Sequence, residues 1–332
     1  MKKLSKHKFE TATKFIKENA DPINLAWYAY NFEGMSDEAF ISQLGKYQFD
    51  NGGFGGLTYE YEYQGPSLKC TEHAFRYIYY LKNKPPATHT MIQKMMQYVL
   101  ERYRPDIGCW GDLLEPGVND GLHVWWWEYE GHPTPIANFD ERVRQYNPNG
   151  QAALAAFVAL YCELVPVELY KDVISYPVEK VLRYFDINSP LYGKSSTDPS
   201  DTEDYTVPYN VKCLSQFCDC LKDRLLVEKL KLILKQNTTS CMDLDESKWH
   251  EGYHEIPCDI VTFPESFLYE GVKDLVNSSI NYVISQQTEN GSWRITYLFG
   301  EDEGFRTLEY KYNVHFTMLR LAMLRRFGRI ER

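Results

Sequence analysis

Two acidic residues two positions apart, Asp243 and Asp245, are the side chains of this chain best suited to acid catalysis. Glu246 follows directly, so the segment reads Asp243-Leu244-Asp245-Glu246. Neighbouring carboxylates repel each other's charge, and one of them then keeps its proton at neutral pH, as a general acid must. The residues that follow, SKWHEGYHEIP, do not begin an apolar helix. That flank favours the alternative interpretation, an exposed acidic loop.

A second group of candidates lies in the irregular segment 111–146, which contains His123 and three consecutive tryptophans, Trp125, Trp126 and Trp127. Loops this long within a compact domain are usually functional or disordered. Three tryptophans argue against disorder, because so much apolar surface must be buried or must bind something. They either cover one end of the fold or line a substrate pocket, and both interpretations stay open.

Three turns share one spacing, and they indicate an internal repeat. Residues 48–54 read QFDNGGF, residues 287–293 read QTENGSW and residues 104–110 read RPDIGCW. Each has an acid at its third position, Gly at its fifth and an aromatic residue at its seventh. A Gln amide at a helix end can satisfy unpaired carbonyls, Gly allows the turn, and the ring covers apolar surface. These turns should therefore end outer helices, with Phe54 and Trp293 packed on them.

The stretches QFDNGGFGG and QQTENGSW resemble the QW-type repeats of the terpenoid cyclase and protein prenyltransferase superfamily. The runs SLKCTEHAFRYIYYL and EYKYNVHFTMLRLAML, which follow the two turns, are similar to inner helices of that family. The resemblance implies an all-α fold, an (α/α)6 toroid of six helical hairpins in two concentric rings. Residues 1–332 would form one such domain, since no Pro/Gly/Ser-rich linker divides the chain. Class II cyclases of this family protonate their substrates with a D-x-D-D motif, which Asp243–Glu246 resembles as D-x-D-E.

The helical pattern supports hairpins in which apolar inner helices alternate with more polar outer ones. Helical runs are predicted at residues 5–19, 22–33, 36–48, 67–82, 88–103, 149–164, 166–185, 204–222, 224–236, 263–270, 271–287 and 310–327. In a closed ring the inner helices begin at one rim, where their positive dipole ends favour anions. Polar residues at those starts are Glu72, His73, Asn147, Asn149, Asp204, Tyr205, Tyr209, Glu265, Tyr310, Tyr312 and His315.

The candidate site combines these positions with the two motifs. Asp245, Asp243 and Asp204 are the candidate catalytic residues. The candidate substrate-binding residues are Trp125, Trp126, Trp127, His123, Tyr205, Tyr209, Tyr312 and His315. We expect no metal, because the zinc-binding Asp-x-Cys pair of the prenyltransferases does not occur in the sequence. We expect no other cofactor either, since no phosphate-binding loop motif is present.

The composition of the chain limits the kinds of partner that it can bind. The net charge is −10 and the sequence pI is about 5.4, which argues against nucleic acid or an anionic membrane as the main partner. No stretch of about 18 apolar residues occurs that would span a bilayer. No secretory signal is evident at the N-terminus, and the eight scattered cysteines indicate reduced, mostly buried thiols of a cytoplasmic protein.

The predicted function is binding or catalysis on a small molecule in a central cavity, with acid-catalysed chemistry on an isoprenoid-like substrate. Aromatic residues make up 15% of the chain, and their ring faces could stabilise a carbocation. The same rings could instead stack on sugars. A carbohydrate-active α/α barrel would use two separated carboxylates, with Asp112, Asp120, Glu128 and Asp204 as candidates. A non-catalytic binding toroid is the third alternative, since a fold does not determine a function.

Overall fold

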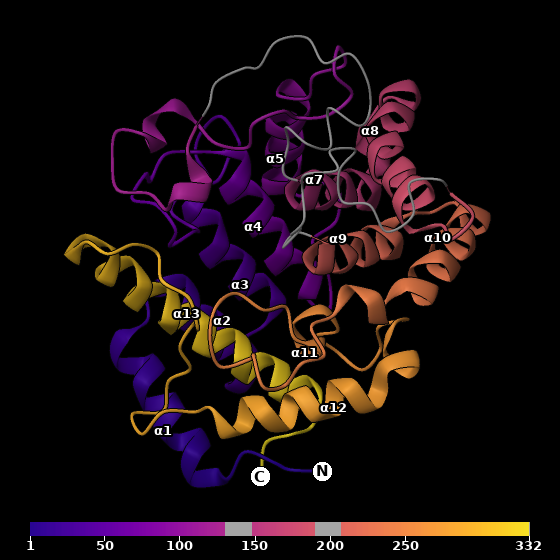
Figure 1. The fold of residues 1–332 in the computed structure, drawn as a ribbon. Helices are drawn as coiled ribbons and strands as arrows, with labels where there is room; N and C mark the ends of the chain where they lie inside the picture. Colours follow the sequence, from indigo (N-terminus) through magenta and orange to yellow (C-terminus); the bar gives the residue numbers. More distant parts are fainter. Residues whose placement is uncertain (130–147, 190–206, 332) are drawn as a thin grey trace.

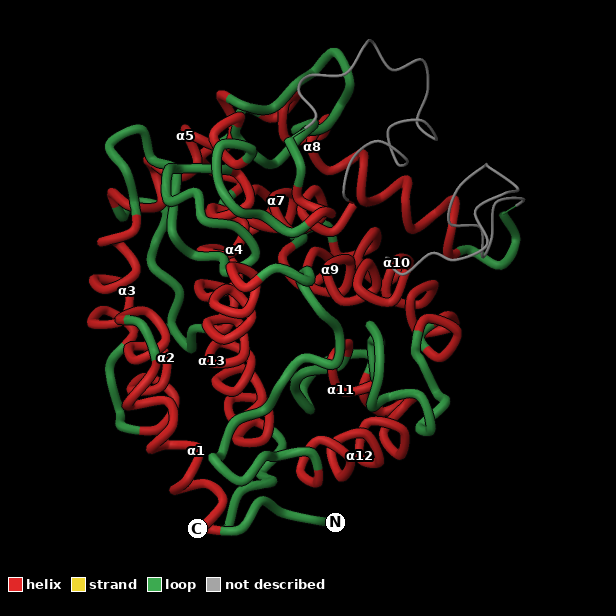
Figure 2. Tube along the Cα trace, turned by 60° about the vertical axis from the view of Figure 1, so that its left-hand side comes forward, coloured by secondary structure: helices red, strands yellow, loops and turns green. Residues whose placement is uncertain are grey.

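The computed structural model describes residues 1–129, 148–189 and 207–331, and this part of the chain contains twelve α-helices and no β-strand (Figures 1 and 2). The helices are α1 (Lys6–Asn19), α2 (Pro22–Phe32), α3 (Asp37–Leu44), α4 (Leu68–Tyr80), α5 (Thr90–Glu101), α7 (Pro148–Leu160), α8 (Val167–Lys180), α9 (Val207–Cys220), α10 (Arg224–Asn237), α11 (Pro257–Ile260), α12 (Tyr269–Ser285) and α13 (Glu303–Arg326). The predicted all-α class is confirmed.

Several helices begin where a short polar side chain caps the free amides of the first turn. Ser36 accepts from Ala39 N at the start of α3, and Ser67 accepts from Cys70 N at the start of α4. Asp21 caps α2 in the same way, and Pro22 follows it at the first helical position, where a missing N–H costs nothing. These caps determine the residue at which each of the three helices begins.

Helices that follow each other in the chain pack in pairs, and one helix of each pair also contacts a helix of the next pair. α3, α5, α8, α10 and α12 contact α2, α4, α7, α9 and α11 respectively, and α1 contacts both α2 and α13. Within the set α2, α4, α7, α9 and α11, α4 contacts α7, α7 contacts α9, and α9 contacts α11. α13 contacts α2, whose Trp27 meets Tyr77 of α4 with ring centroids 5.2 Å apart.

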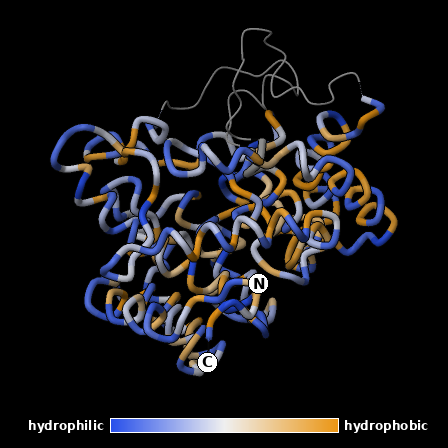
Figure 3. The backbone as a smooth tube through the Cα atoms, turned by 60° about the horizontal axis from the view of Figure 1, so that its bottom comes forward, coloured by the Kyte–Doolittle hydropathy of each residue, from blue (hydrophilic) through white to orange (hydrophobic). Residues whose placement is uncertain are grey.

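The most apolar helix, α7, is surrounded by other helices. Its residues from Ala152 to Ala159 are at most 1% exposed. It contacts α4, α8 and α9, which leaves no face of this stretch for solvent. Its apolar character on all sides predicted such a position. Figure 3 shows the opposite pattern along much of the molecular periphery, where hydrophilic residues predominate.

The two glutamine turns are equivalent contact by contact. Gln48 Nε2 donates to the carbonyls of Gly52 (3.0 Å) and Met91 (2.9 Å), and Met91 lies in the first turn of α5. Gln287 Nε2 donates to the carbonyls of Gly291 and Lys8, both at 3.0 Å, and Lys8 lies in the first turn of α1. Each glutamine therefore ties the end of one helix pair to the start of another helix, α5 for Gln48 and α1 for Gln287.

The glycines of these turns allow that close approach. Gly52 and Gly291 both have φ of +90°, which other residues rarely adopt. A Cβ at Gly52 would lie 2.0 Å from the Lys94 carbonyl oxygen of α5, and one at Gly291 would lie 2.5 Å from the Thr11 backbone of α1. The turn backbone thus packs directly on the neighbouring helix.

The aromatic residues of the turns are buried, as predicted. Phe54 N donates to Thr71 Oγ1 of α4 at 3.0 Å, and Trp293 N donates to Thr317 Oγ1 of α13 at 2.9 Å. Trp293 Nε1 also donates to Val283 O at 2.7 Å, near the end of α12. The Trp293 turn thereby links α12 to α13, and the Phe54 turn packs on α4.

The third turn keeps the ring but loses the glutamine contact. Trp110 Nε1 donates to Val99 O at 2.8 Å, and its backbone N–H donates to Gln151 Oε1 of α7 at 2.9 Å. Arg104, in the place of the glutamine, forms an ion pair of 2.5 Å with Asp106 inside its own turn. The aromatic position is therefore the common structural element of the three turns.

The two ends of the described chain lie side by side (Figure 1). Leu4 N donates to Arg329 O at 2.7 Å, and Glu331 N donates to Leu4 O at 2.9 Å. Arg329 is 2% exposed, and its Nη1 donates to Asn277 Oδ1 of α12 at 2.9 Å. A buried arginine therefore fastens both ends of the chain to α12.

Two predicted helices are wrong in position. The segment 263–270 lies in turns until α12 begins at Tyr269, and the short helix lies earlier, at α11. Pro264 explains this, because the residue before a proline disfavours the helical conformation. α13 begins at Glu303 instead of residue 310. All eight cysteines are free, and seven of them are buried, as predicted. In the described ranges, every helix is too short or too polar to cross a membrane.

Candidate functional site

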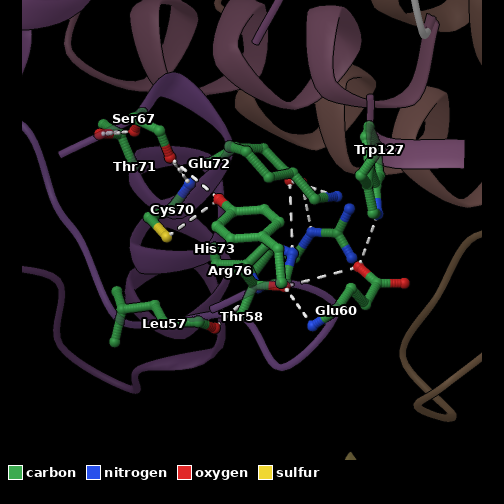
Figure 4. Close-up of polar contacts among 12 residues, drawn as sticks. Leu57, Thr58, Glu60, Ser67, Cys70, Thr71, Glu72, His73, Arg76 and Trp127 are labelled. Carbon is green, nitrogen blue, oxygen red and sulfur yellow. Dashed lines mark hydrogen bonds and ion pairs between the residues drawn. The ribbon is translucent and has the colours of Figure 1, made fainter. Parts of the chain in front are cut away.

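A charged cluster lies on one face of α4 (Figure 4). Residues 69, 72, 73 and 76 share a face because they are three or four positions apart. The Glu72 carboxylate is fully buried and forms ion pairs with Arg76 Nε and, at 3.6 Å, with Lys69 Nζ. A buried carboxylate is tolerated only with such partners. Glu72 and His73 were both predicted site positions, and the structure brings them together.

The charge state of this cluster follows from its burial. Burial opposes the charge of Arg76, but the Glu72 carboxylate outweighs it and raises the pKa of the guanidinium. Burial, together with the charges of Lys69 and Arg76, lowers the pKa of His73 well below its ordinary value. The 3.8 Å contact of His73 Nε2 with Glu72 is therefore a contact of a neutral ring. His73 Nδ1 donates to Leu57 O at 3.0 Å.

Glu60 connects this cluster to the tryptophan segment. Trp127 Nε1 donates to Glu60 Oε2 at 2.9 Å, as Figure 4 shows, and Lys69 Nζ lies 4.2 Å from the centroid of the Trp127 ring. A lysine over a tryptophan face is a cation–π contact. The carboxylate of Glu60 and the ammonium of Lys69 therefore hold Trp127 from two sides.

Aromatic rings continue from this point towards α13. Trp126 packs on Phe299 with centroids 5.9 Å apart, and Phe299 packs on Tyr312 at 5.3 Å. Tyr297 meets Tyr253 at 5.3 Å. Burial raises the pKa of Tyr297 and of Tyr312 above the ordinary value for a phenol, so both rings are neutral. For Tyr312 the carboxylates of Glu60 and, more weakly, Glu255 raise the pKa further. Ring contacts through Phe299 and Tyr297 connect Tyr312 to Tyr253.

Glu255 belongs to a second buried acidic group. It is 9% exposed and accepts from Tyr253 OH at 2.5 Å. Burial raises the pKa of Glu255, and the nearby charge of Asp259 raises it further, whereas Lys212 and Arg320 oppose the shift. Asp259 itself forms a two-pronged ion pair with Arg320 of α13, whose Nη2 donates to Oδ2 at 3.0 Å. Glu255 is therefore biased towards its protonated form.

His315 of α13 lies on the other side of Tyr312, with ring centroids 6.3 Å apart. Burial lowers its pKa to about 4, although the charge of Asp21 opposes the shift. His315 Nδ1 lies 2.8 Å from Asn24 Oδ1 of α2. A cavity of about 570 Å³ adjoins this contact, and its lining includes Asp21, Asn24 and Tyr59.

The predicted acid at Asp245 is not supported by the structure. Its side chain is 48% exposed, and it accepts from Ser247 Oγ at 2.5 Å. Hydrogen bonds from Ser247 and the charge of Lys248 lower its pKa, so it is ionised at neutral pH. The Asp243 carboxylate contacts His254 Nδ1, and the Asp243 carbonyl accepts from Trp249 Nε1 at 3.0 Å. The exposed-loop interpretation of this segment therefore holds.

The other predicted positions differ in their contacts and in their exposure. Trp126 and Tyr312 share a contact with Phe299, whereas Trp125 is 78% exposed. His123 lies beside its own turn, with Nδ1 3.0 Å from Gly121 O. Predicted positions that the structure leaves exposed are Asp120, Glu128, Glu265 and Tyr310. Asn147, Asp204 and Tyr205 lie outside the described residues, and the side chain of Tyr209 in α9 is not described.

No sequence pattern singled out Glu255, Asp259 or Arg320 as site residues. Glu255 lies just before the single turn of α11, Asp259 lies within that turn, and Arg320 follows Asp259 by 61 positions. The i, i+4 spacing of the two acids is a weak signal, because it is common on exposed helices. Glu60 was missed for a similar reason, since its loop has no helical pattern.

In the described part of the chain, no group of three or more His, Cys, Asp or Glu side chains could hold a metal ion. No model of a known protein family matches the chain, and neither a curated protein nor a solved structure matches it.

Proposed function

We propose that the chain is an (α/α)6 toroid of the terpenoid cyclase and prenyltransferase type. Within it, Glu255 would initiate acid-catalysed chemistry on an isoprenoid-like molecule. The observation that carries the proposal is the buried carboxyl of Glu255, which sits beside the acid Asp259 and against the ring of Tyr253.

The arrangement of helices supports the toroid. The helices α2, α4, α7, α9 and α11 contact one another in series, and α13 contacts α2. The ion pair between Arg320 of α13 and Asp259 of α11 joins the two ends of that series. In an outer layer, Gln287 joins the turn after α12 to α1, as Gln48 joins the turn after α3 to α5. Both layers would then close on themselves.

The acid assignment rests on what a carbon-protonating acid requires. An alkene is a very weak base, so its acid must be protonated at neutral pH and shielded from water. Burial and a neighbouring carboxylate raise the pKa of Glu255 in the direction of this state, whereas Asp245 is exposed and ionised. The properties first expected of Asp245 therefore fit Glu255.

The surrounding rings suit a cationic intermediate. Protonation of a carbon–carbon double bond leaves a carbocation, which ring faces and carboxylates stabilise electrostatically. Tyr253, Tyr297, Phe299 and Tyr312 form a connected group of rings beside Glu255, and Glu60 acts on Tyr312. Neutral phenols serve here, because an ionised one would quench the cation.

The proposal is tested first by infrared difference spectroscopy at neutral pH. Wild type minus Glu255→Gln should show the carbonyl stretch of one protonated carboxylic acid. Asp245→Asn should not remove that band. Absence of the band from the wild type would contradict the assignment of Glu255 as the protonated acid.

A ligand comparison tests the substrate class. Farnesyl dimethylamine is an ammonium ion at neutral pH and imitates a carbocation, whereas farnesol has the same chain without the charge. We expect the amine to bind at least tenfold more tightly in calorimetric titration, equivalent to about 1.4 kcal/mol. Equal affinity for both compounds would contradict the carbocation role.

A carbohydrate-active enzyme is the second candidate, and one observation favours it. Glu60 accepts from Trp127 Nε1 and Glu255 accepts from Tyr253 OH, so two acidic residues from different parts of the chain contact one group of aromatic side chains, as two catalytic carboxylates would flank a sugar. Trp127 beside Glu60 would supply a stacking surface. Tight binding of a gluco-oligosaccharide, with no preference for the amine over farnesol, would favour this candidate.

A further inference from the structure

The tautomer of His315 follows from a chain of contacts at the start of α2. Asn24 Nδ2 lies 3.1 Å from Asp21 Oδ1 and 2.5 Å from Tyr59 OH. The Asp21 carboxylate can only accept hydrogen bonds, so the amide nitrogen of Asn24 must face it. The amide oxygen then faces His315, where Oδ1 lies 2.8 Å from Nδ1.

An amide oxygen only accepts, so His315 Nδ1 must carry the proton. The ring is neutral at pH 7, because its pKa is lowered to about 4. Its second nitrogen, Nε2, therefore holds an unshared electron pair. Among the residues that the structure describes, none forms a hydrogen bond or ion pair with Nε2, and the ring is only partly buried. Asn24 thus locks His315 as a base whose lone pair is available.

The position of the ring places this base in the proposed site. The His315 ring lies between Tyr59, at a centroid distance of 5.2 Å, and Tyr312, at 6.3 Å. Tyr312 in turn packs on Phe299, and the ring contacts continue through Tyr297 to Tyr253. The Tyr253 hydroxyl donates to Glu255, so a connected series of aromatic rings joins the base His315 to the acid Glu255.

We propose that His315 is the base that ends the reaction, with Asn24 as its positioning residue. The inference rests on the proposed function. Nε2 would form an N–H bond while a C–H bond next to the cationic carbon breaks, and the electrons of that bond become a new double bond. Together with proton donation by Glu255, the reaction is an isomerisation or cyclisation without an oxidant. Water would return the proton from His315 to Glu255.

The basicity of His315 suits this step. A carbocation is a far stronger acid than an imidazolium ion, so a weak base is sufficient to deprotonate it. A weak base also has the advantage of staying unprotonated at neutral pH. Asp21, reached through Asn24, stabilises the imidazolium that forms, whereas Arg76 opposes it and favours rapid loss of the proton.

The test is nitrogen NMR of the full chain labelled with ¹⁵N-histidine. At pH 7 the wild type should show His315 with Nδ1 protonated and Nε2 bare. Asn24→Leu removes the acceptor and should shift the population towards the Nε2–H tautomer. Tyr59→Phe keeps the Asn24–Asp21 contact and should retain the wild-type tautomer. An Nε2–H ring or an imidazolium in the wild type would overturn the inference, whether or not the Asn24→Leu protein folds.

Two amines then separate the base from the proposed function. Farnesyl dimethylammonium has an N–H that can donate to Nε2, and farnesyl trimethylammonium has the same charge without a donor. We expect both to bind and only the first to shift the Nε2 resonance towards that of a hydrogen-bonded nitrogen. Binding of both without that shift overturns the base assignment alone. Failure of both to bind overturns the proposed function and the base with it.

Discussion

Asp245 and Glu255 lie ten positions apart in the sequence and have opposite environments. Asp245 is exposed, and Ser247 and Lys248 lower its pKa. Glu255 is 9% exposed, and burial and Asp259 raise its pKa. Asp243 N donates to Glu255 O at 3.2 Å, so the two segments even share a backbone contact.

The difference shows that the spacing of acids in a motif does not determine which of them can donate a proton. The Asp243–Glu246 segment has the carboxylate spacing of an acid motif, but water and local donors stabilise its charge. Glu255 belongs to no such motif, but burial and the charge of Asp259, four positions later, raise its pKa. Each prediction below tests one side of this contrast.

The largest effect should come from the cation that balances the interior acids. Arg320→Met keeps a long side chain on Phe316 but leaves Asp259 without its two-pronged partner. Breaking one side of a buried ion pair destabilises a protein by about 3–5 kcal/mol, and denaturant unfolding would measure this loss. Arg325→Met, an exposed change on the same helix, is the matched control. Equal stability of the two variants would mean that the interior acids do not need Arg320.

The next effect concerns a base of the interior. The pKa of His315 is lowered to about 4 from 6.5, so its contribution to stability is complete above pH 6.5 and is lost as the pH falls towards 4. The loss should reach roughly 3 kcal/mol, with His73 contributing in the same direction. Denaturant unfolding from pH 7 to 4 should show a shallower loss for His315→Gln than for the wild type. The exposed His7→Gln should follow the wild type; a His315→Gln curve that also does so would refute the assignment.

Glu255 should show the opposite sign and a smaller effect. Because the pKa of Glu255 is raised in the folded state, its contribution is complete below the ordinary glutamate pKa of about 4.3 and is lost as the pH rises through the folded pKa. Glu255→Gln cannot ionise, so it should gain stability relative to the wild type between pH 4 and pH 7. Unfolding curves at those two pH values give the comparison. A relative loss of stability would show that Glu255 is ionised in the folded protein.

Much of the helical architecture could be predicted because its determinants are local or periodic. The glutamine turns at residues 48–54 and 287–293 make equivalent contacts, and the uniformly apolar α7 is buried among three helices. The single turn of α11 was placed too late, because Ile256 and Pro257 begin a helix too short to produce a period.

The site was only partly predictable, for the same physical reason. Tyr312 and His315 were found from their place on a helix, and the structure brings them together. Glu255 depends on Asp259, and Asp259 on Arg320, 61 positions away, so no local pattern reveals that these charges share the interior. The tautomer of His315 likewise depends on Asn24, 291 positions earlier.

The smallest effect is expected at Asp245, and it tests the contrast most directly. Asp245→Asn keeps the size of the side chain and an acceptor for Ser247, and its exposed charge is screened by water. The unfolding midpoint should stay within error of the wild type, and the affinity for farnesyl dimethylamine should not change. Glu255→Gln, which is equally conservative, should lose the infrared band of the protonated acid. If Asp245→Asn lost that band, or bound the amine tenfold more weakly with its fold intact, the acid would have to be assigned to Asp245 despite its exposure.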